Sequence, residues 1–285
     1  MRVAILILAH KDKDQLEKLI QHLSKDFDIY IHIDKKWDID QGYFSKYKNI
    51  TVLKEYRVSW GSYTQILATL SLFKTAFSKG YDFYMLISGQ DLPLKSNKYI
   101  IEYLGQHKES SFINYEKLPK QTWLKKENGG FNRLHFYWGP YYPTGWMEKI
   151  ERAVLRYIRI FQRLTHIKRK LDSLTYYGGW NWVNLNREAM AYVLDYVNKN
   201  PSFLNQFKHT MSGDEIWVQT ILLNSSLKVV NNDLRYVDWN TMSPHPRTLL
   251  MEDLDKLKSS ECFFARKFDM KVDKDIVESI YKLIK

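Results

Sequence analysis

The sequence has little cysteine and no long hydrophobic run. Cys262 is the only cysteine in 285 residues, so no intramolecular disulfide can form. The apolar run near the start extends only from Val3 to Ala9. It is too short to span a bilayer, and it lacks a small-residue cleavage site. These absences suit a reducing compartment, and we expect a cytoplasmic protein without a secretion signal.

Sequence motifs of several enzyme classes are also missing. There is no glycine-rich P-loop, no G-x-S-x-G nucleophile elbow and no cluster of His, Cys and Asp at zinc spacing. Hydrolase and zinc-enzyme interpretations therefore lose support. Asp38-Ile39-Asp40 has the Asp-x-Asp form with which many nucleotide-sugar enzymes hold a divalent metal. Lys35 and Lys36 nearby would oppose a dication, so a metal-dependent enzyme using this pair is only an alternative.

The amino-acid composition is typical of a folded, basic protein. A hydrophobic content of 45% over this length can bury a core of one large α/β domain or two small ones. A net charge of +11 predicts attraction to polyanions, which include nucleic acids, anionic membranes and phosphorylated small molecules. The 20 Tyr and 9 Trp suit stacking on sugars or bases, but an aromatic core would use them as well.

Strand and helix patterns alternate through the first third of the chain. Continuous apolar runs predict buried strands at residues 2–9, 28–34, 50–53 and 82–88. Apolar residues at helical spacing predict one helix after Asp12, with Leu16, Leu19, Ile20 and Leu23 on its buried face, and a second over residues 63–78. The alternation predicts an α/β fold with a mostly parallel sheet.

Ligands of such sheets bind outside the carboxyl ends of the strands. That rule selects five residues that directly follow predicted strands or short extended segments: His10, Asp34, Ser59, Trp60 and Asp91. Further along, residues 180–185 are predicted to form another strand.

Residues 116–175 interrupt the pattern with an aromatic and basic insertion. Its main feature is a predicted helix over residues 147–171, which carries eight basic residues and two glutamates. Ile150, Val154, Tyr157, Phe161 and Leu164 recur on its other face at spacings of three and four. The pattern fits either a helix that lies on an anionic membrane or a core-packed helix with a solvated basic face.

The stretch MSGDEIWVQTILLNS, residues 211–225, carries two adjacent carboxylates. Ser212 or Asp214 can cap a helix, and Glu215 would then lie in its first turn, where the helix dipole favours an ionised carboxylate. One interpretation is helix-start chemistry alone. The other is a general base that stays deprotonated at neutral pH and points into a cleft.

Six blocks in order along the chain resemble the core-2/I-branching enzymes. They are VSWGSYTQILATLSLF (58–73), YMLISGQDLPLKSN (84–97), SGDEIWVQTIL (212–222), LRYVDW (234–239), SPHPRTLLMEDL (243–254) and FFARKFD (263–269). This family, glycosyltransferase family 14, includes β-1,6-N-acetylglucosaminyltransferases and peptide O-xylosyltransferases. The resemblance implies a single Rossmann-like domain of the glycosyltransferase A type over residues 1–285, inverting and metal-independent. It does not cover the 116–175 insertion.

The resemblance also implies roles for individual residues. Carried over to this sequence, the residues that contact the UDP-sugar are Ala9, His10, Asp34, Val58, Ser59, Trp60, Asp91, Arg247, Arg266 and Lys267. Glu215 matches the catalytic base and Asp214 its neighbour on the acceptor side. The donor is then a substrate, and neither a cofactor nor a metal is expected.

The basic pair Arg266 and Lys267 lies among Phe263, Phe264 and Phe268, in a context too apolar for an ordinary solvated charge run. Departure of a nucleoside diphosphate develops negative charge on the β-phosphate, and fixed cations in a pocket poor in water can stabilise it in place of a metal. We expect the phenylalanine rings to hold both cations and limit their hydration. Glu215 would then deprotonate an acceptor hydroxyl for a single displacement.

Two features depart from the animal enzymes, which carry a membrane anchor and several disulfides. Their absence here suggests a short bacterial relative with a glycan or lipid-linked saccharide acceptor, acting in surface polysaccharide synthesis in the cytoplasm at the inner face of the membrane. UDP-N-acetylglucosamine is the first donor candidate, before UDP-xylose and UDP-galactose. Trp146, Trp180 and Trp182, with Tyr141 and Tyr142, are candidates for stacking on acceptor sugars. A binding module driven by charge is the other alternative, but no nucleic-acid motif is present.

Overall fold

The computed structural model describes residues 1–44, 46–123, 125–139, 146–240 and 245–284. The strands are β1 (Val3–Ala9), β2 (Asp28–Ile33), β3 (Ile50–Leu53), β4 (Phe83–Ser88), β5 (Asp91–Pro93), β6 (Ser111–Ile113), β7 (Glu116–Lys117), β8 (Tyr177–Gly178), β9 (Val183–Asn186), β10 (Val229–Asn231), β11 (Arg235–Val237) and β12 (Phe264–Arg266). The helices are α1 (Lys13–Leu23), α2 (Tyr63–Phe77), α3 (Asn97–Gln106), α4 (Phe131–His135), α5 (Trp146–Thr165), α6 (Arg187–Lys199), α7 (Pro201–Gln206), α8 (Trp217–Leu223), α9 (Leu254–Ser259) and α10 (Lys274–Leu283).

Within the described residues, the main sheet has seven strands in the order β10-β6-β9-β4-β1-β2-β3. Strands β3, β2, β1 and β4 run parallel, whereas β9 is antiparallel to both of its neighbours, β4 and β6. The order 3-2-1-4 is that of a Rossmann half, with its switch point beside β1. The predicted α/β fold with a mostly parallel sheet flanked by helices is confirmed, and so are the first four predicted strands to within one residue at either end.

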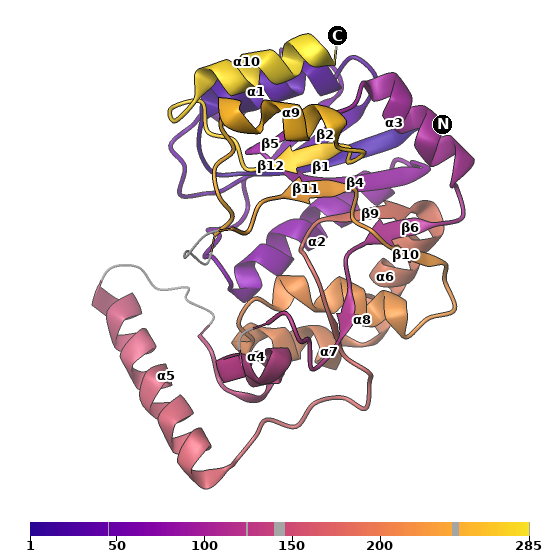
Figure 1. The fold of residues 1–285 in the computed structure, drawn as a ribbon. Coiled ribbons are helices and arrows are strands. Elements are labelled where there is room, and N and C mark those ends of the chain that lie inside the picture. The colour runs from indigo at the N-terminus through magenta and orange to yellow at the C-terminus, as the bar shows by residue number, and fades with distance from the viewer. Residues whose placement is uncertain (45, 124, 140–145, 241–244, 285) are drawn as a thin grey trace.

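Helices cover both faces of this sheet because its strands are apolar on both sides. Alternate residues of β1 point to opposite faces: Ala4 and Leu6 join the core under α2, α6 and α8, whereas Val3, Ile5 and Ile7 join the core under α1 and α3. Figure 1 shows the two helical layers above and below the sheet. The helix predicted after Asp12 is α1, and Asp12 caps it, since its carboxylate accepts from the Gln15 amide at 3.2 Å.

A small sheet, β11-β12-β5, lies against a separate apolar cluster with α9 and α10. Strand β12 is antiparallel to β5, with Arg266 opposite Asp91. The C-terminal segment therefore returns to the end of β4, and this return brings the basic pair to the main sheet.

The insertion contains α4 and α5, and α5 stands away from the body of the protein (Figure 1). It begins and ends at Trp146 and Thr165, which is shorter than the predicted 147–171. Its apolar residues are exposed, so the interpretation as a core-packed helix is wrong. No helix among the described residues is long and apolar enough to cross a membrane.

Candidate active site

A cavity of about 510 Å³ opens at the carboxyl ends of β1, β2 and β4. This is the edge that the parallel-sheet rule selects. The predicted site residues that line it are Ala9, His10, Asp34, Val58, Trp60, Trp180, Trp182, Asp214, Glu215, Arg266 and Lys267. Ser59, Asp91, Trp146 and Arg247 are not among the described residues that line it.

Asp34 joins the end of β2 to the loop before α2. One carboxylate oxygen accepts from the backbone amides of Lys36 at 2.9 Å and Val58 at 3.3 Å. The Lys36 ammonium donates to the Val58 carbonyl at 2.6 Å and lies 3.6 Å from the second oxygen of Asp34. These contacts hold this part of the cavity wall in one geometry. The Ser59 amide, in the same loop, donates to the Thr64 hydroxyl at 2.9 Å.

The cationic wall of the cavity is formed by Arg266 and Lys267, and a buried carboxylate lies behind it. Asp91 is fully buried, accepts from Arg235 at 3.0 Å and lies 3.7 Å from Nε of Arg266. The structure therefore does not bring Asp91 to the cavity surface, where the resemblance placed it. Its carboxylate instead orients the arginine that lines the cavity.

Trp182 contributes an aromatic ring to the cationic wall. The Arg266 guanidinium lies over this ring, 4.1 Å from its centroid, a cation–π arrangement. The three phenylalanines expected to hold the pair, Phe263, Phe264 and Phe268, are fully buried. Trp182 thus shares the anchoring role predicted for them, and its face toward Arg266 is not open to an acceptor sugar.

Lys267 lines the cavity in a strongly positive environment. Burial, and then the charges of Lys11 and Arg266, lower the pKa of its ammonium group. Lys11 is itself paired with Asp269 at 2.7 Å. The concentration of positive charge indicates that an anion would be bound favourably at this wall.

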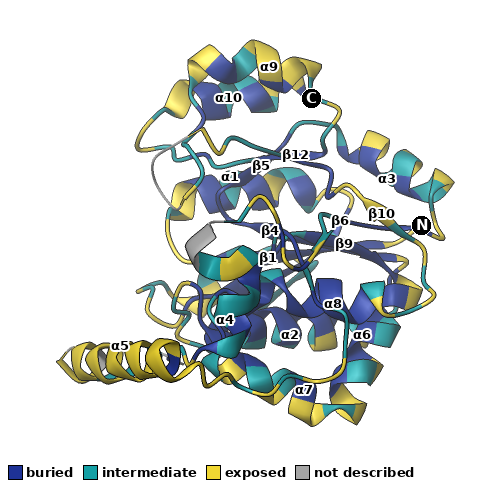
Figure 2. Ribbon diagram, turned by 60° about the horizontal axis from the view of Figure 1, so that its bottom comes forward, coloured by how far each residue is buried: buried dark blue, intermediate teal, exposed yellow. Residues whose placement is uncertain are grey.

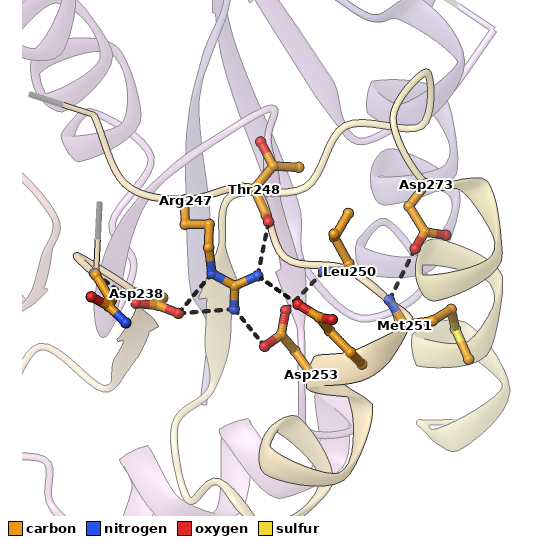
Figure 3. A network of polar contacts seen from close by, with 9 residues as sticks. Asp238, Arg247, Thr248, Leu250, Met251, Asp253 and Asp273 are labelled. Carbon is orange, nitrogen blue, oxygen red and sulfur yellow. Dashed lines mark hydrogen bonds and ion pairs between the residues drawn. The ribbon is translucent and has the colours of Figure 1, made fainter. Parts of the chain in front are cut away.

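Arg247 has a different environment from Lys267. Figure 3 shows its guanidinium between Asp238 and Asp253. Its guanidinium lies 2.9 Å from an oxygen of Asp238, 2.5 Å from one of Asp253 and 3.5 Å from one of Glu252. Three carboxylates already neutralise this cation, so the structure does not bring it to the cavity as a diphosphate ligand. Arg247 instead ties the segment after β11 to the start of α9.

The acidic wall is centred on Glu215. Its carboxylate pairs with Arg133 at 2.6 Å, and Arg133 also pairs with Glu127 at 2.8 Å. The Arg133 guanidinium lies over the Trp123 ring, 3.8 Å from its centroid. Arg133, Glu127 and Trp123 all belong to the insertion, which therefore holds the candidate base.

The backbone at Glu215 differs from the predicted one. Gly213–Glu215 form a short 3-10 turn, and α8 begins only at Trp217, after Ile216. The Ser212 side chain makes no capping hydrogen bond to this turn. The prediction that Glu215 lies in the first turn of a capped α-helix is wrong, so the helix dipole alone does not explain this residue.

Close backbone approaches also fix the Glu215 turn. The Gly179 amide donates to the Glu215 carbonyl at 2.8 Å. A Cβ at Gly179 would lie 1.8 Å from the Asn114 carbonyl oxygen, so only glycine fits there. The Ser212 amide donates to the Gly61 carbonyl at 2.8 Å, which joins the turn to the loop that carries Trp60.

Burial changes the proton affinity of both acids. Burial raises the pKa of Asp214, and the charge of Glu215 raises it further. Burial also raises the pKa of Glu215, while the charge and hydrogen bond of Arg133 oppose that rise. Oδ1 of Asp214 has no hydrogen-bond partner among the described residues. The pair therefore holds protons more tightly than ordinary carboxylates, and Arg133 favours ionisation of Glu215.

The predicted stacking residues divide into two groups. Trp180 lines the cavity and stacks on Trp239 with ring centroids 4.8 Å apart. Trp146 lies at the start of α5 with 70% of its surface exposed, away from the described residues of the cavity. Tyr141 and Tyr142 lie outside the described residues.

The described residues contain no group of three or more His, Cys, Asp and Glu that could hold a metal ion. Asp38 and Asp40 are exposed, and neither is among the described residues that line the cavity. The Asp-x-Asp pair therefore does not share the site of the basic pair. Asp40 instead accepts from the Gly42 amide at 3.0 Å, a local turn contact.

Sequence reasoning missed several residues of the site. Trp239 and His245 line the cavity, and both lie in blocks that carried the family resemblance, so that signal could have found them. Arg133 and Lys120 had no such signal, because neither lies in the six blocks that carried the resemblance. Lys120 is buried, with its ammonium 5.0 Å from the Trp180 ring centroid, and its charge favours ionisation of Glu215.

The chain is similar in sequence to known transferases. A xylosyltransferase from Ciona intestinalis is 24% identical over 315 residues, which cover 98% of this chain and 34% of that protein. Xylosyltransferase 1 from Mus musculus is 23% identical over 311 residues, which cover 97% of this chain and 30% of that protein. The chain thus spans about a third of the length of these relatives.

A solved structure, a putative glucose-1-phosphate thymidylyltransferase from Bacillus anthracis in complex with a sucrose, is a more distant match. It covers 80% of this chain and 86% of its own, with 11% identity and a TM-score of 0.36, a likeness too weak to support an argument. The family model of the core-2/I-branching enzyme matches residues 3–133 and 128–258, which together make up most of the chain. The chain therefore belongs to the core-2/I-branching enzyme family.

Proposed function

We propose that this protein is an inverting, metal-independent glycosyltransferase that moves a sugar from a UDP-sugar to a hydroxyl of a glycan acceptor. One observation carries the proposal: a cavity at the switch point of the sheet combines a half-buried carboxylate, Glu215, with the paired cations Arg266 and Lys267. A transferase of this kind needs a base at one end of the reacting bond and a stabiliser of the leaving diphosphate at the other.

The cationic wall fits the leaving group. As the glycosidic bond breaks, negative charge develops on the β-phosphate of UDP, and Lys267 with Arg266 would neutralise it. The electrostatic gain is larger in a partly buried site than in water. Asp91 and Trp182 hold Arg266 before the donor binds, so little reorganisation is needed when the charge develops.

The acidic wall fits a general base. Glu215 takes the proton from the acceptor hydroxyl, whose oxygen attacks the anomeric carbon from the face opposite the diphosphate, and the configuration inverts. Burial raises the pKa of Glu215, which makes it a stronger base than an ordinary glutamate, while Arg133 favours its ionised form.

For the substrates, we propose UDP-N-acetylglucosamine as the donor and a lipid-linked saccharide or growing surface polysaccharide as the acceptor, at the cytoplasmic face of a bacterial membrane. Likeness to xylosyltransferases makes UDP-xylose the second donor to test. Trp180 and Trp60, on the cavity wall, are the rings that we assign to sugar contacts.

The test is a panel of UDP-sugars, assayed for thermal stabilisation and slow donor hydrolysis in excess EDTA and in manganese. We expect stabilisation and hydrolysis by one donor with EDTA present and little change with manganese. The double variant D38N/D40N should behave as the wild type, because both residues are exposed outside the cavity lining. Loss of activity in EDTA with recovery in manganese would contradict metal independence, and no response to any UDP-sugar would contradict the donor class.

A further inference from the structure

Helix α5 exposes an apolar stripe that runs its full length. Ile150, Val154, Tyr157, Phe161 and Leu164 recur every three or four residues and therefore lie on one side of the helix. Their exposed fractions are 52%, 51%, 72%, 58% and 76%. Trp146 and Met147 extend the stripe at one end, and Figure 2 shows α5 exposed along almost its whole length. Such a contiguous apolar surface marks an interaction site.

The opposite side of α5 is basic, and Arg159 on this side contacts the body of the protein. Arg152, Arg156, Arg159 and Arg163 recur at spacings of four, three and four. Arg159 donates to the Tyr137 carbonyl at 3.2 Å, and its guanidinium lies 4.3 Å from the Trp138 ring centroid.

Gln162 completes the attachment of α5 to the body. Its side chain accepts from the Tyr137 amide at 2.9 Å and donates to the His135 carbonyl at 3.3 Å. His135, Tyr137 and Trp138 thus hold α5 by its polar side. This attachment points the apolar stripe away from the described body of the protein.

We propose that α5 docks on the surface of an anionic lipid bilayer, with the apolar stripe inserted at the boundary between headgroups and acyl chains. A 20-residue helix is about 30 Å long, and an amphipathic helix with arginines on its polar face lies in the plane of this boundary. The arginine side chains would reach lipid phosphates by extending along the helix surface. The contact does not depend on the sugar-transfer reaction.

Charge selects the bilayer over a second copy of the chain as the occupant. Helix α5 carries Lys149 and four arginines against Glu148 and Glu151, and Ile167, Lys168 and Lys170 are exposed just after it. Pairing two copies through this stripe would bring two basic helices together in a protein of net charge +11. An anionic surface instead neutralises the same charges.

The experiment is cosedimentation of the full chain with vesicles of phosphatidylglycerol or of phosphatidylcholine alone. The apolar variant is I150S/F161S, and its matched control is V272S/M251S, which alters exposed apolar residues elsewhere. The charge variant is K149Q/R156Q, and its control is K98Q/K199Q, which removes two charges from exposed lysines on other helices. Melting temperature is measured for every variant, and sedimentation velocity for the wild type and I150S/F161S.

We expect binding to phosphatidylglycerol vesicles only, weakened at least about tenfold by I150S/F161S and weakened less by K149Q/R156Q. Both controls should bind as the wild type. Raising the salt from about 0.1 M to about 1 M should weaken binding, since the screening length falls from about 10 Å to about 3 Å. Unchanged vesicle binding by I150S/F161S, equal binding to phosphatidylcholine, or no binding at all would overturn the proposal. So would a wild-type dimer that I150S/F161S abolishes.

Discussion

The two walls of the cavity are built differently. The cationic wall is formed on the sheet, where β12 pairs with β5 and places Arg266 opposite Asp91, with both backbones in regular hydrogen-bonded strands. The acidic wall is a short 3-10 turn whose carboxylate is held by Arg133 from the insertion. The leaving-group end is therefore fixed by strand pairing, whereas the base end depends on side-chain contacts from the insertion. Substitutions at the two walls should separate donor binding from catalysis.

The largest expected effect is on the acidic wall, at Glu215. Glu215→Gln keeps the shape of the side chain but cannot accept a proton, so the transfer rate should fall by about two to four orders of magnitude. UDP affinity and melting temperature should stay close to those of the wild type, because Gln can still accept a hydrogen bond from Arg133. Glu261→Gln, an exposed substitution, is the control. Retention of more than about a tenth of wild-type turnover would refute the assignment of the base.

Asp91, which supports the cationic wall, should have the largest effect on the stability of the protein. Asp91→Asn leaves Arg235 and Arg266 without their buried carboxylate, and breaking a buried ion pair costs about 3 to 5 kcal/mol in the free energy of unfolding. Urea unfolding measures this difference. Asp255→Asn, at a side chain that is 94% exposed, should change it by less than about 0.5 kcal/mol. Equal stability of the two variants would show that Asp91 does not support the wall.

Lys267 and Arg247 sharpen the comparison because both were assigned to the diphosphate. Lys267→Ala should weaken UDP binding by about 1 to 3 kcal/mol, the range for a lost charge-assisted contact. Arg247→Gln should lower the melting temperature, since it breaks three ion pairs, and should leave UDP affinity unchanged. Isothermal calorimetry of UDP binding to both variants distinguishes the two roles. A weaker UDP affinity for the Arg247 variant than for the Lys267 variant would restore the original assignment.

Arg133 should have the smallest effect, a shift of the pH profile. Its positive charge lowers the pKa of Glu215 against the effect of burial, so removing that charge raises the pKa. The base form is lost as the pH falls through this pKa, so the acidic limb of kcat/KM should lie at higher pH in Arg133→Met than in the wild type. Arg133→Lys should lie between them. Identical acidic limbs in all three proteins would show that Arg133 does not act on the base.

Much of the sheet could be predicted from the sequence, because a continuous apolar run such as Val3–Ala9 fits a buried parallel strand. The rule that ligands bind at strand ends then selected His10 and Asp34, and both line the cavity. The ion pairs of Arg247 could not be predicted, because the three carboxylates that neutralise its charge come together only in the folded chain. Whether the apolar face of α5 is buried or exposed could not be predicted either. An amphipathic pattern shows which residues share a face, but not what that face contacts.

The binding position of UDP tests the central claim most directly. The decisive measurement is a crystal structure of the wild-type protein with UDP, grown in excess EDTA. The account predicts that the diphosphate lies within hydrogen-bond distance of Lys267 Nζ and the Arg266 guanidinium, with Glu215 on the side where the sugar would extend. A diphosphate bound elsewhere, or bound only when manganese is added and through Asp38 and Asp40, would contradict it.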